Sequence, residues 1–123
     1  MGLFGFGKNK ENKLPWENLT SSSQIEKLIV ASQEIPVLIY KHSTRCGISS
    51  MALSRLESSW NADTSRCKLV FLDLIAFRDV SNTVSEKLNV VHQSPQAILL
   101  KNGEVVYHAS HSEINSEKIQ SLI

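Results

Sequence analysis

The sequence predicts an α/β fold in which a mixed central sheet carries helices on both faces. Two apolar runs, Pro36 to Tyr40 and Cys67 to Ala76, have the length and the β-branched or aromatic content of buried strands. Segments with helical apolar spacing separate these runs, and two strands joined through such helical crossovers run parallel. The dipeptide Asn102-Gly103, set between two further apolar runs, predicts an antiparallel hairpin near the end of the chain.

Residues 14–123 are expected to form one domain, preceded by a flexible lead-in over residues 1–13. A chain of 123 residues with 41% hydrophobic and 20% charged residues fits a single hydrophobic core. The lead-in places its apolar residues before its charges, the reverse of a secretory signal, and has Phe6 where the myristoylation pattern needs Ser or Thr. Contact of Phe4 and Phe6 with the domain or with a membrane face is an alternative role for this segment.

The first half of the domain alternates strands and helices. Trp16 to Leu19 is expected to form a short strand or an extended entry. The helical apolar spacing that follows, with serines 21–23 as the cap, predicts a helix that ends before Pro36. After the first buried strand, apolar residues at helical spacing predict a second helix over Ile48 to Trp60.

The second half continues from the second buried strand with segments of helical or strand periodicity. These are a helix (Val80 to Leu88), the two hairpin strands (Ala97 to Leu100 and Val105 to Ala109) and a last helix (Ile114 to Ile123). Asp79 is expected to cap the first of these helices, and Ser112 or Asn115 the last. A polar loop, VHQSPQ, joins the third helix to the hairpin.

Charge and cysteine content exclude several classes of protein. The formal net charge is +1 and the basic residues are scattered, so no nucleic-acid partner is expected. No integral membrane segment is expected either. The two cysteines, Cys46 and Cys67, are too few and too far apart for a secreted disulfide scaffold, which favours the reducing cytoplasm as the location.

Cys46 is placed where the first buried strand passes into a helix that Gly47 opens. At a helix start, unpaired backbone N–H groups and the positive end of the helix dipole favour a thiolate over a thiol. Lys41, His42 and Arg45 are expected to act in the same direction. The sequence therefore predicts a nucleophilic thiolate at Cys46.

The residue three positions after Cys46 is Ser49, where a C-x-x-C redox motif has its second thiol. A serine hydroxyl cannot resolve a mixed disulfide, so the site is predicted to be monothiol. Ser49 is instead expected to donate a hydrogen bond to the Cys46 sulfur. Cys67 is expected to fill the core, with a disulfide to Cys46 as the alternative.

The placing of Cys46 after the leading parallel strand, with Ser94-Pro95 directly before a hairpin strand, resembles the thioredoxin fold and its cis-proline loop. The resemblance implies a cis Pro95, and a loop that lies opposite Cys46 and in which Ser94 and Pro95 offer backbone hydrogen bonds to an extended substrate. From the residues alone, a Ser-Pro before a strand is more often an ordinary trans turn.

Two motifs, K-H-S-T-x-C-x-I-S and H-x-S-P-Q-A, are similar to those of the YtxJ-like monothiol bacilliredoxins from about Leu14 to the C-terminus. Members of that family remove bacillithiol, a small thiol, from mixed disulfides on other proteins. The resemblance implies a monothiol thiol-disulfide oxidoreductase with bacillithiolated client proteins as partners, bacillithiol as thiol co-substrate and no other cofactor. The family pattern usually has proline at the position of Gly47.

The expected site has two catalytic residues, Cys46 and Ser49, and a surrounding set of substrate-binding residues. The expected substrate-binding residues are Lys41, His42, Thr44, Arg45, Gly47, His92, Ser94 and Pro95. Lys41 and His42 would recognise carboxylates of the small thiol, or else form only a charged strand end. His92 would bind substrate or be a solvated loop residue. No metal is expected, because apart from His42 and Cys46 no pair has a metal-ligand spacing.

Two other functions remain open from the sequence. Cys46 to Ser49 also resembles the CGFS site of monothiol glutaredoxins, which carry a [2Fe–2S] cluster, although the Thr-Val-Pro and Gly-Gly patterns of those proteins are absent. A redox-inactive adaptor that docks through the proline loop is the other alternative. Brown colour would favour the first function, and retained function in Cys46→Ser the second.

Overall fold

The computed structural model describes residues 14–123, so the predicted lead-in lies outside the described residues. Helices and strands alternate along the chain, with short 3₁₀ turns labelled η. The elements are β1 (Glu17–Asn18), α1 (Ser23–Ala31), β2 (Val37–His42), α2 (Gly47–Ser58), η2 (Thr64–Arg66), β3 (Lys68–Asp73), α3 (Arg78–Leu88), β4 (Gln96–Lys101), β5 (Glu104–Ser110), η3 (His111–Glu113) and α4 (Ser116–Leu122).

The described strands form one five-stranded sheet in the order β1-β3-β2-β4-β5. β3 pairs in parallel with both β1 and β2, whereas β4 pairs antiparallel with β2 and with β5. The turn between β4 and β5 has Asn102 and Gly103 at positive φ, as an Asn-Gly hairpin turn requires. The predicted parallel core and antiparallel hairpin are therefore confirmed.

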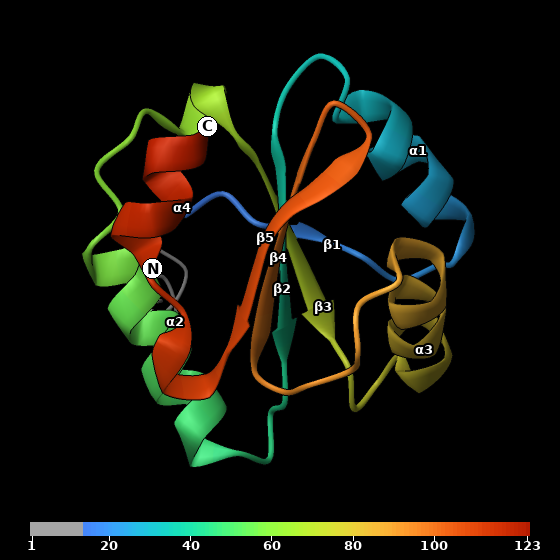
Figure 1. Cartoon of the computed structure of the whole chain (residues 1–123). Helices are drawn as coiled ribbons and strands as arrows, with labels where there is room; N and C mark the ends of the chain where they lie inside the picture. Colours follow the sequence, from blue (N-terminus) through green and yellow to red (C-terminus); the bar gives the residue numbers. More distant parts are fainter. Residues whose placement is uncertain (1–13) are drawn as a thin grey trace, which may run out of the picture.

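Helices cover both faces of this sheet. Figure 1 shows α1 and α3 on one side, and α2 and α4 on the other. Side chains of β2 alternate between the two cores: Leu38 and Tyr40 pack toward α2 and α4, whereas Val37 and Ile39 pack toward α1 and α3. This two-sided burial explains why β2 is apolar without a break over these residues, and it confirms the predicted α/β class.

β2 is longer than predicted, because Lys41 and His42 continue it. Lys41 pairs with Leu72 of β3 and Gln96 of β4, and His42 pairs with Asp73. All six residues of β2 are buried. The predicted apolar run stops at Tyr40, but pairing with neighbouring strands continues the strand through these two polar residues.

Two other boundaries differ from the prediction. β3 ends at Asp73, whose carboxylate accepts the N–H groups of Ile75 and Ala76 and turns the chain. Phe77 then takes the N-cap position of α3, so the prediction that Asp79 caps this helix is wrong. Asp79 lies in the first turn instead, where its charge suits the helix dipole.

The last helix begins later than predicted, after η3, and Asn115 caps it by accepting the N–H of Lys118. Of the two predicted caps, Ser112 and Asn115, it is therefore Asn115 that caps this helix.

Among residues 14–123, no helix has the length and apolar character needed to cross a bilayer.

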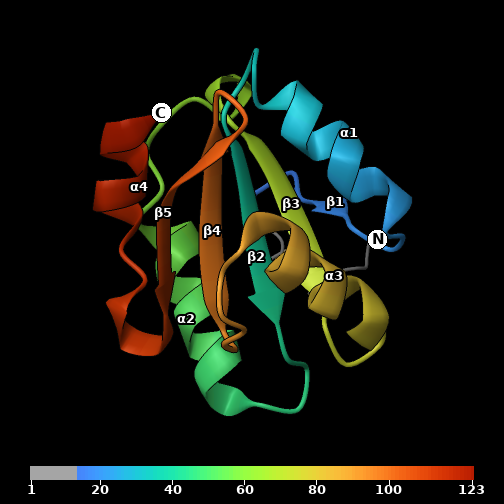
Figure 2. The same cartoon turned by 45° about the vertical axis from the view of Figure 1, so that its right-hand side comes forward.

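One end of the sheet collects several loops. Figures 1 and 2 show that β2, β3 and β5 end, and β4 begins, at the same end of the sheet. The loops before α2, before β4 and after β5 therefore lie close together. Reactive groups in open α/β sheets occupy this kind of position, beyond the carboxyl ends of parallel strands.

Candidate active site

Cys46 is the N-cap residue of α2, as predicted. Its backbone is extended (φ −118°, ψ 117°), and its carbonyl accepts the N–H groups of Ser49 and Ser50. Its own N–H donates to the carbonyl of Ser43, which closes the turn between β2 and the helix. The side chain is a free thiol and is partly exposed. Cys46 is therefore open to a reaction partner at the start of a helix.

The residues around this turn divide into an exposed and a buried group. Thr44, Arg45 and Gly47 are exposed beside Cys46, where an incoming substrate can contact them. A Cβ atom built on Gly47 would meet no atom within 4 Å, so the first residue of α2 stands free of the rest of the fold.

Ser49 is completely buried, and hydrogen bonds fix both its hydroxyl and its carbonyl. Its Oγ lies 2.8 Å from Nδ1 of His42 and accepts the N–H of Ser43 at 3.1 Å. Its carbonyl accepts the hydroxyl of Tyr40 at 2.8 Å. Within residues 14–123 the Ser49 hydroxyl makes no hydrogen bond to the Cys46 sulfur, because His42 and Ser43 occupy that hydroxyl, so the predicted bond is not formed.

His42 is buried and 7% exposed, with its ring centroid 5.3 Å from that of Phe71. Burial lowers the pKa of His42, and the Asp73 carboxylate opposes this only in part. The ring is therefore neutral at pH 7. The prediction that His42 recognises substrate is contradicted, since its side chain faces Ser49 and the core rather than the surface.

Lys41 is also completely buried, on the face of the sheet that α3 covers. Its Nζ lies 3.0 Å from the Ser85 hydroxyl, 3.5 Å from the Ser81 carbonyl and 3.2 Å from Nδ1 of His92. Burial lowers its pKa to about 8. Direct contact with a substrate is excluded by this burial, and the prediction is wrong on that point.

Lys41 instead orients His92, which is exposed in the loop before β4. An ammonium group only donates hydrogen bonds, so Nδ1 of His92 accepts from Lys41 and the proton of the neutral ring is on Nε2. Partial burial, and then the charges of Lys41 and Arg78, lower the pKa of His92. His92 is thus held as a neutral ring whose Nε2–H can donate to a partner.

The Ser94–Pro95 peptide bond is cis, as the resemblance implied. Pro95 is buried, and its carbonyl accepts the N–H of His111 from the turn after β5. The Ser94 hydroxyl is buried without a hydrogen-bond partner among the described residues. This loop is therefore tied to the end of the hairpin.

Cys67 lies at the opposite end of the sheet from Cys46. It directly precedes β3, whose first residue pairs with Val37 at the start of β2, whereas Cys46 follows the end of β2. The six residues of β2 span about 20 Å at ~3.3 Å each. A disulfide needs Cα atoms roughly 4.4–6.8 Å apart, so the folded domain does not permit a Cys46–Cys67 bond.

Cys67 is a core residue in this structure, 2% exposed, and burial raises its pKa to about 12. The prediction that it fills the core is confirmed. Among the described residues, no group of three or more His, Cys, Asp or Glu side chains is placed to hold a metal ion.

Two residues near the site were not predicted from the sequence. Arg55 of α2 and His111 of η3 line one pocket with Ile48, although they are distant in the chain. Only His111 has an unusual feature that could have drawn attention to it, a φ of +55° in a residue other than glycine. This feature is visible in the structure and not in the sequence.

Comparison with known proteins agrees with this geometry. The profile of the family described as monothiol bacilliredoxin BrxC matches residues 17–119. A solved protein described as a candidate oxidoreductase with a thioredoxin fold is 31% identical with a TM-score of 0.71, over 85% of this chain and 89% of that one.

Two thioredoxins of known structure share the fold at low identity. The thioredoxin of Trypanosoma brucei brucei is 15% identical with a TM-score of 0.65, over 90% of this chain and 93% of its own. That of Malassezia sympodialis is 16% identical, also with a TM-score of 0.65, over 88% and 87%. Because the profile match spans β2, Cys46, α2 and the loop before β4, the chain belongs to the monothiol bacilliredoxin family of thiol-redox proteins and has the thioredoxin fold.

Proposed function

We propose that the protein removes bacillithiol, or a similar small thiol, from mixed disulfides on other proteins. The Cys46 thiolate attacks the sulfur of the small thiol, a new disulfide forms between Cys46 and the small thiol, and the client leaves as a thiolate. A second small thiolate then attacks that same sulfur, releases the Cys46 thiolate and leaves as a symmetrical disulfide. Each step exchanges one disulfide for another, and over the cycle the second small thiol is the reductant, because it ends as the symmetrical disulfide while the client thiol is restored.

The observation that supports this proposal most directly is that Ser49, in the position of a resolving thiol, is buried and fully hydrogen bonded. Ser49 is buried and hydrogen bonded to His42 and Ser43, and the remaining cysteine, Cys67, is at the far end of the sheet. A mixed disulfide on Cys46 therefore has no thiol of the same domain to displace it. This supports small-thiol transfer over reduction of ordinary protein disulfides.

Bacillithiolated proteins are the proposed clients, and bacillithiol is the proposed co-substrate, both on the basis of family membership. The proposed setting is the reducing cytoplasm, which suits the two free cysteines. Thr44, Arg45, Gly47, His92, Ser94 and Pro95 remain the proposed substrate-binding residues, with the exposed members in direct contact.

The test is an intact-mass experiment with a protein that carries one bacillithiol. Incubation with the wild type should remove the modification and add the mass of one bacillithiol to Cys46. Cys46→Ser should leave the substrate modified, and Cys67→Ser should behave like the wild type. Visible absorbance should stay absent after anaerobic purification.

Two results would argue against the proposal. Removal of bacillithiol by Cys46→Ser would mean that another group performs the chemistry. A chelatable brown chromophore, with no transfer of the small thiol, would instead identify an iron–sulfur carrier.

A further inference from the structure

A pocket of about 180 Å³ lies between α2 and the turn that follows β5. Its walls are Ile48, Met51, Ala52 and Arg55 from α2, with His111 and Ser112 from η3. Taking ~30 Å³ for each water molecule, it has room for a group of roughly six non-hydrogen atoms. Ile48 and Met51 are 58% and 66% exposed, so an occupant would cover apolar surface that is now in contact with solvent.

The polar groups of this pocket favour an anion. Arg55 carries a positive charge, and His111 and Ser112 add hydrogen-bond donors, whereas no acidic side chain lines the walls. Among residues 14–123, both ion pairs belong to other side chains, Lys68 with Glu17 and Lys87 with Glu26. The Arg55 guanidinium therefore keeps its bonding capacity for a ligand, and guanidinium groups bind carboxylates well.

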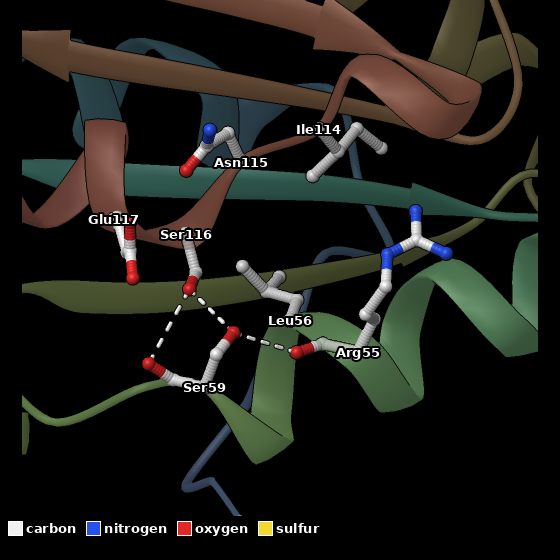
Figure 3. Close-up of a pocket in the computed structure, with 7 residues that line it drawn as sticks. All are labelled: Arg55, Leu56, Ser59, Ile114, Asn115, Ser116 and Glu117. Atoms are coloured by element: carbon white, nitrogen blue, oxygen red, sulfur yellow. Dashed lines mark hydrogen bonds between the residues drawn. The ribbon is translucent and has the colours of Figure 1, made fainter.

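Figure 3 shows the other side of Arg55, where a second pocket lies between α2 and the start of α4. There Ser59 and Ser116 bond to each other, and the Arg55 side chain extends away from that pair. Glu117, the acidic residue of the second pocket, lies at its opposite end from Arg55. Arg55 thus separates the two pockets.

His111 is held in place by its backbone. Its φ of +55° is in the left-handed region, which costs energy for a residue with a side chain. Its N–H donates to the Pro95 carbonyl at 3.1 Å, so the pocket wall is attached to the loop before β4. A conformation of this kind, next to a pocket, is typical of a ligand site.

The distance between Cys46 and the pocket sets how long a ligand bonded to Cys46 must be to reach Arg55. Ile48 is two residues and Arg55 nine residues beyond Cys46 in the chain. At ~1.5 Å per residue, these positions are about 3 Å and about 13 Å along the axis of α2. A group disulfide-bonded to Cys46 can reach this pocket if its charged end is roughly 10 Å from its sulfur.

We infer that this pocket, named here the Arg55 pocket, binds the carboxylate-bearing end of a small thiol while its sulfur is bonded to Cys46. This inference rests on the proposed function for its setting, and it assigns a specificity role to Arg55 and His111. Tripeptide-sized thiols with terminal carboxylates fit, whereas short neutral thiols do not reach the charges.

The first experiment measures adduct formation on Cys46 without any client protein. Purified protein is equilibrated with oxidised and reduced glutathione, with oxidised and reduced bacillithiol, or with the same pair of 2-mercaptoethanol, and the adduct is quantified by intact mass. Arg55→Gln should lower the equilibrium constant for the two carboxylate-bearing thiols about fivefold, the upper range for one exposed charge pair. The 2-mercaptoethanol adduct should not change.

The control is Lys27→Gln, which removes a positive charge from an exposed position on α1, on the other face of the sheet. It should leave all three equilibria unchanged. His111→Gln should act in the same direction as Arg55→Gln, and the double variant should show the larger loss. A difference between the glutathione and bacillithiol arms would identify which thiol the pocket fits.

Equal losses for all three thiols in Arg55→Gln would overturn the inference, because the residue would then act on Cys46 itself. An unchanged equilibrium for both carboxylate-bearing thiols would overturn it as well. The proposed function is judged separately by removal of the small thiol from a client protein. If the wild type leaves clients modified but Arg55 still favours carboxylate-bearing adducts, the function is wrong and the pocket assignment stands.

Discussion

The Oγ atom of Ser49 lies 2.8 Å from the Nδ1 atom of His42. Ser49 belongs to the first turn of α2 and His42 to the last position of β2, so this bond joins the start of the helix to the end of the strand. It occupies the hydroxyl that stands where a two-cysteine redox site has its second thiol. The bond therefore stabilises the site, and the serine that it holds makes the site monothiol.

Ser49→Cys should create an internal path out of the mixed disulfide. The new thiol would stand three residues after Cys46, the spacing of a C-x-x-C pair. The Cys46 adduct should then decay to a disulfide between the two cysteines, with loss of the small thiol by intact mass. Persistence of the adduct in this variant, at the wild-type level, would mean that the first turn of α2 cannot bring both sulfurs together.

His42→Phe should destabilise the domain, because an aromatic ring is kept beside Phe71 but Ser49 loses its partner. The Ser49 oxygen would still accept the N–H of Ser43, but the hydroxyl would lose its bond to His42, and one unsatisfied buried hydrogen-bonding group costs about 1–3 kcal/mol. Urea unfolding measures this loss. Ser49→Ala serves as the matched control: combined with His42→Phe, it should cost less than the two single changes added together. Strict additivity would show that the bond contributes no coupling.

His42→Phe should also change how the free energy of unfolding depends on pH below neutrality. Burial lowers the pKa of His42 from 6.5, so below about pH 6.5 the unfolded chain binds a proton that the folded chain does not. Wild-type stability should therefore decline as the pH falls below about 6.5, and the decline should be smaller in His42→Phe. His92, whose pKa is also lowered, contributes in the same direction in both proteins.

Lys41 should change how the free energy of unfolding depends on pH above neutrality. Its pKa falls from 10.5 to about 8 on burial, so between these values the unfolded amine holds a proton that the folded one has released. This contribution makes stability rise with pH over that window. Tyr40 and Cys67, with pKa values raised to about 12, act in the opposite direction.

The measurement is therefore a difference between two proteins. The stability of wild type relative to Lys41→Met should increase between about pH 8 and pH 10.5, as followed by urea unfolding at each pH. The variant should also shift the NMR titration of His92, because the ring loses the donor on its Nδ1. A flat difference profile would show that Lys41 keeps an ordinary pKa in the folded protein.

Iodoacetamide should modify Cys46 and spare Cys67 in the folded protein. Cys46 is partly exposed, whereas Cys67 is 2% exposed with a pKa raised to about 12. Peptide mapping after a short exposure at neutral pH reads out both sites. In 8 M urea the two cysteines should react alike, which shows that the fold protects Cys67. Similar labelling of both thiols in native buffer would contradict the burial.

Gly47→Pro should stabilise the domain by about 0.4–1 kcal/mol, because proline restricts the unfolded chain and suits the first position of a helix. Gly47 is that position in α2; its φ is not positive and a Cβ there meets no atom within 4 Å. Thermal unfolding measures the gain. Gly47→Ala is the matched control, and destabilisation by proline alone would mean that the N–H of Gly47 has a partner in the protein.

The sequence by itself determined the order of the elements, the position of Cys46 at a helix start and the absence of a thiol at Ser49. These features are local: the periods of strands and helices, and the spacing between neighbouring residues, do not depend on the rest of the fold. The Asn102-Gly103 turn was predictable for the same reason, since few residue types adopt positive φ at low cost.

Only the tertiary structure decided the roles of Lys41, His42 and Cys67, and it alone brought Arg55 beside His111. In the sequence Lys41 and His42 look like residues that contact substrate or a charged strand end. Strand pairing instead buries them, Lys41 between β3 and β4 and His42 beside β3, and each gains a different side-chain partner. Cys67 is excluded as a resolving thiol because parallel pairing of β2 and β3 places the two cysteines at opposite ends of the sheet. These outcomes depend on which strands are neighbours and in what register, and such long-range pairing leaves no trace in the local spacing of residues.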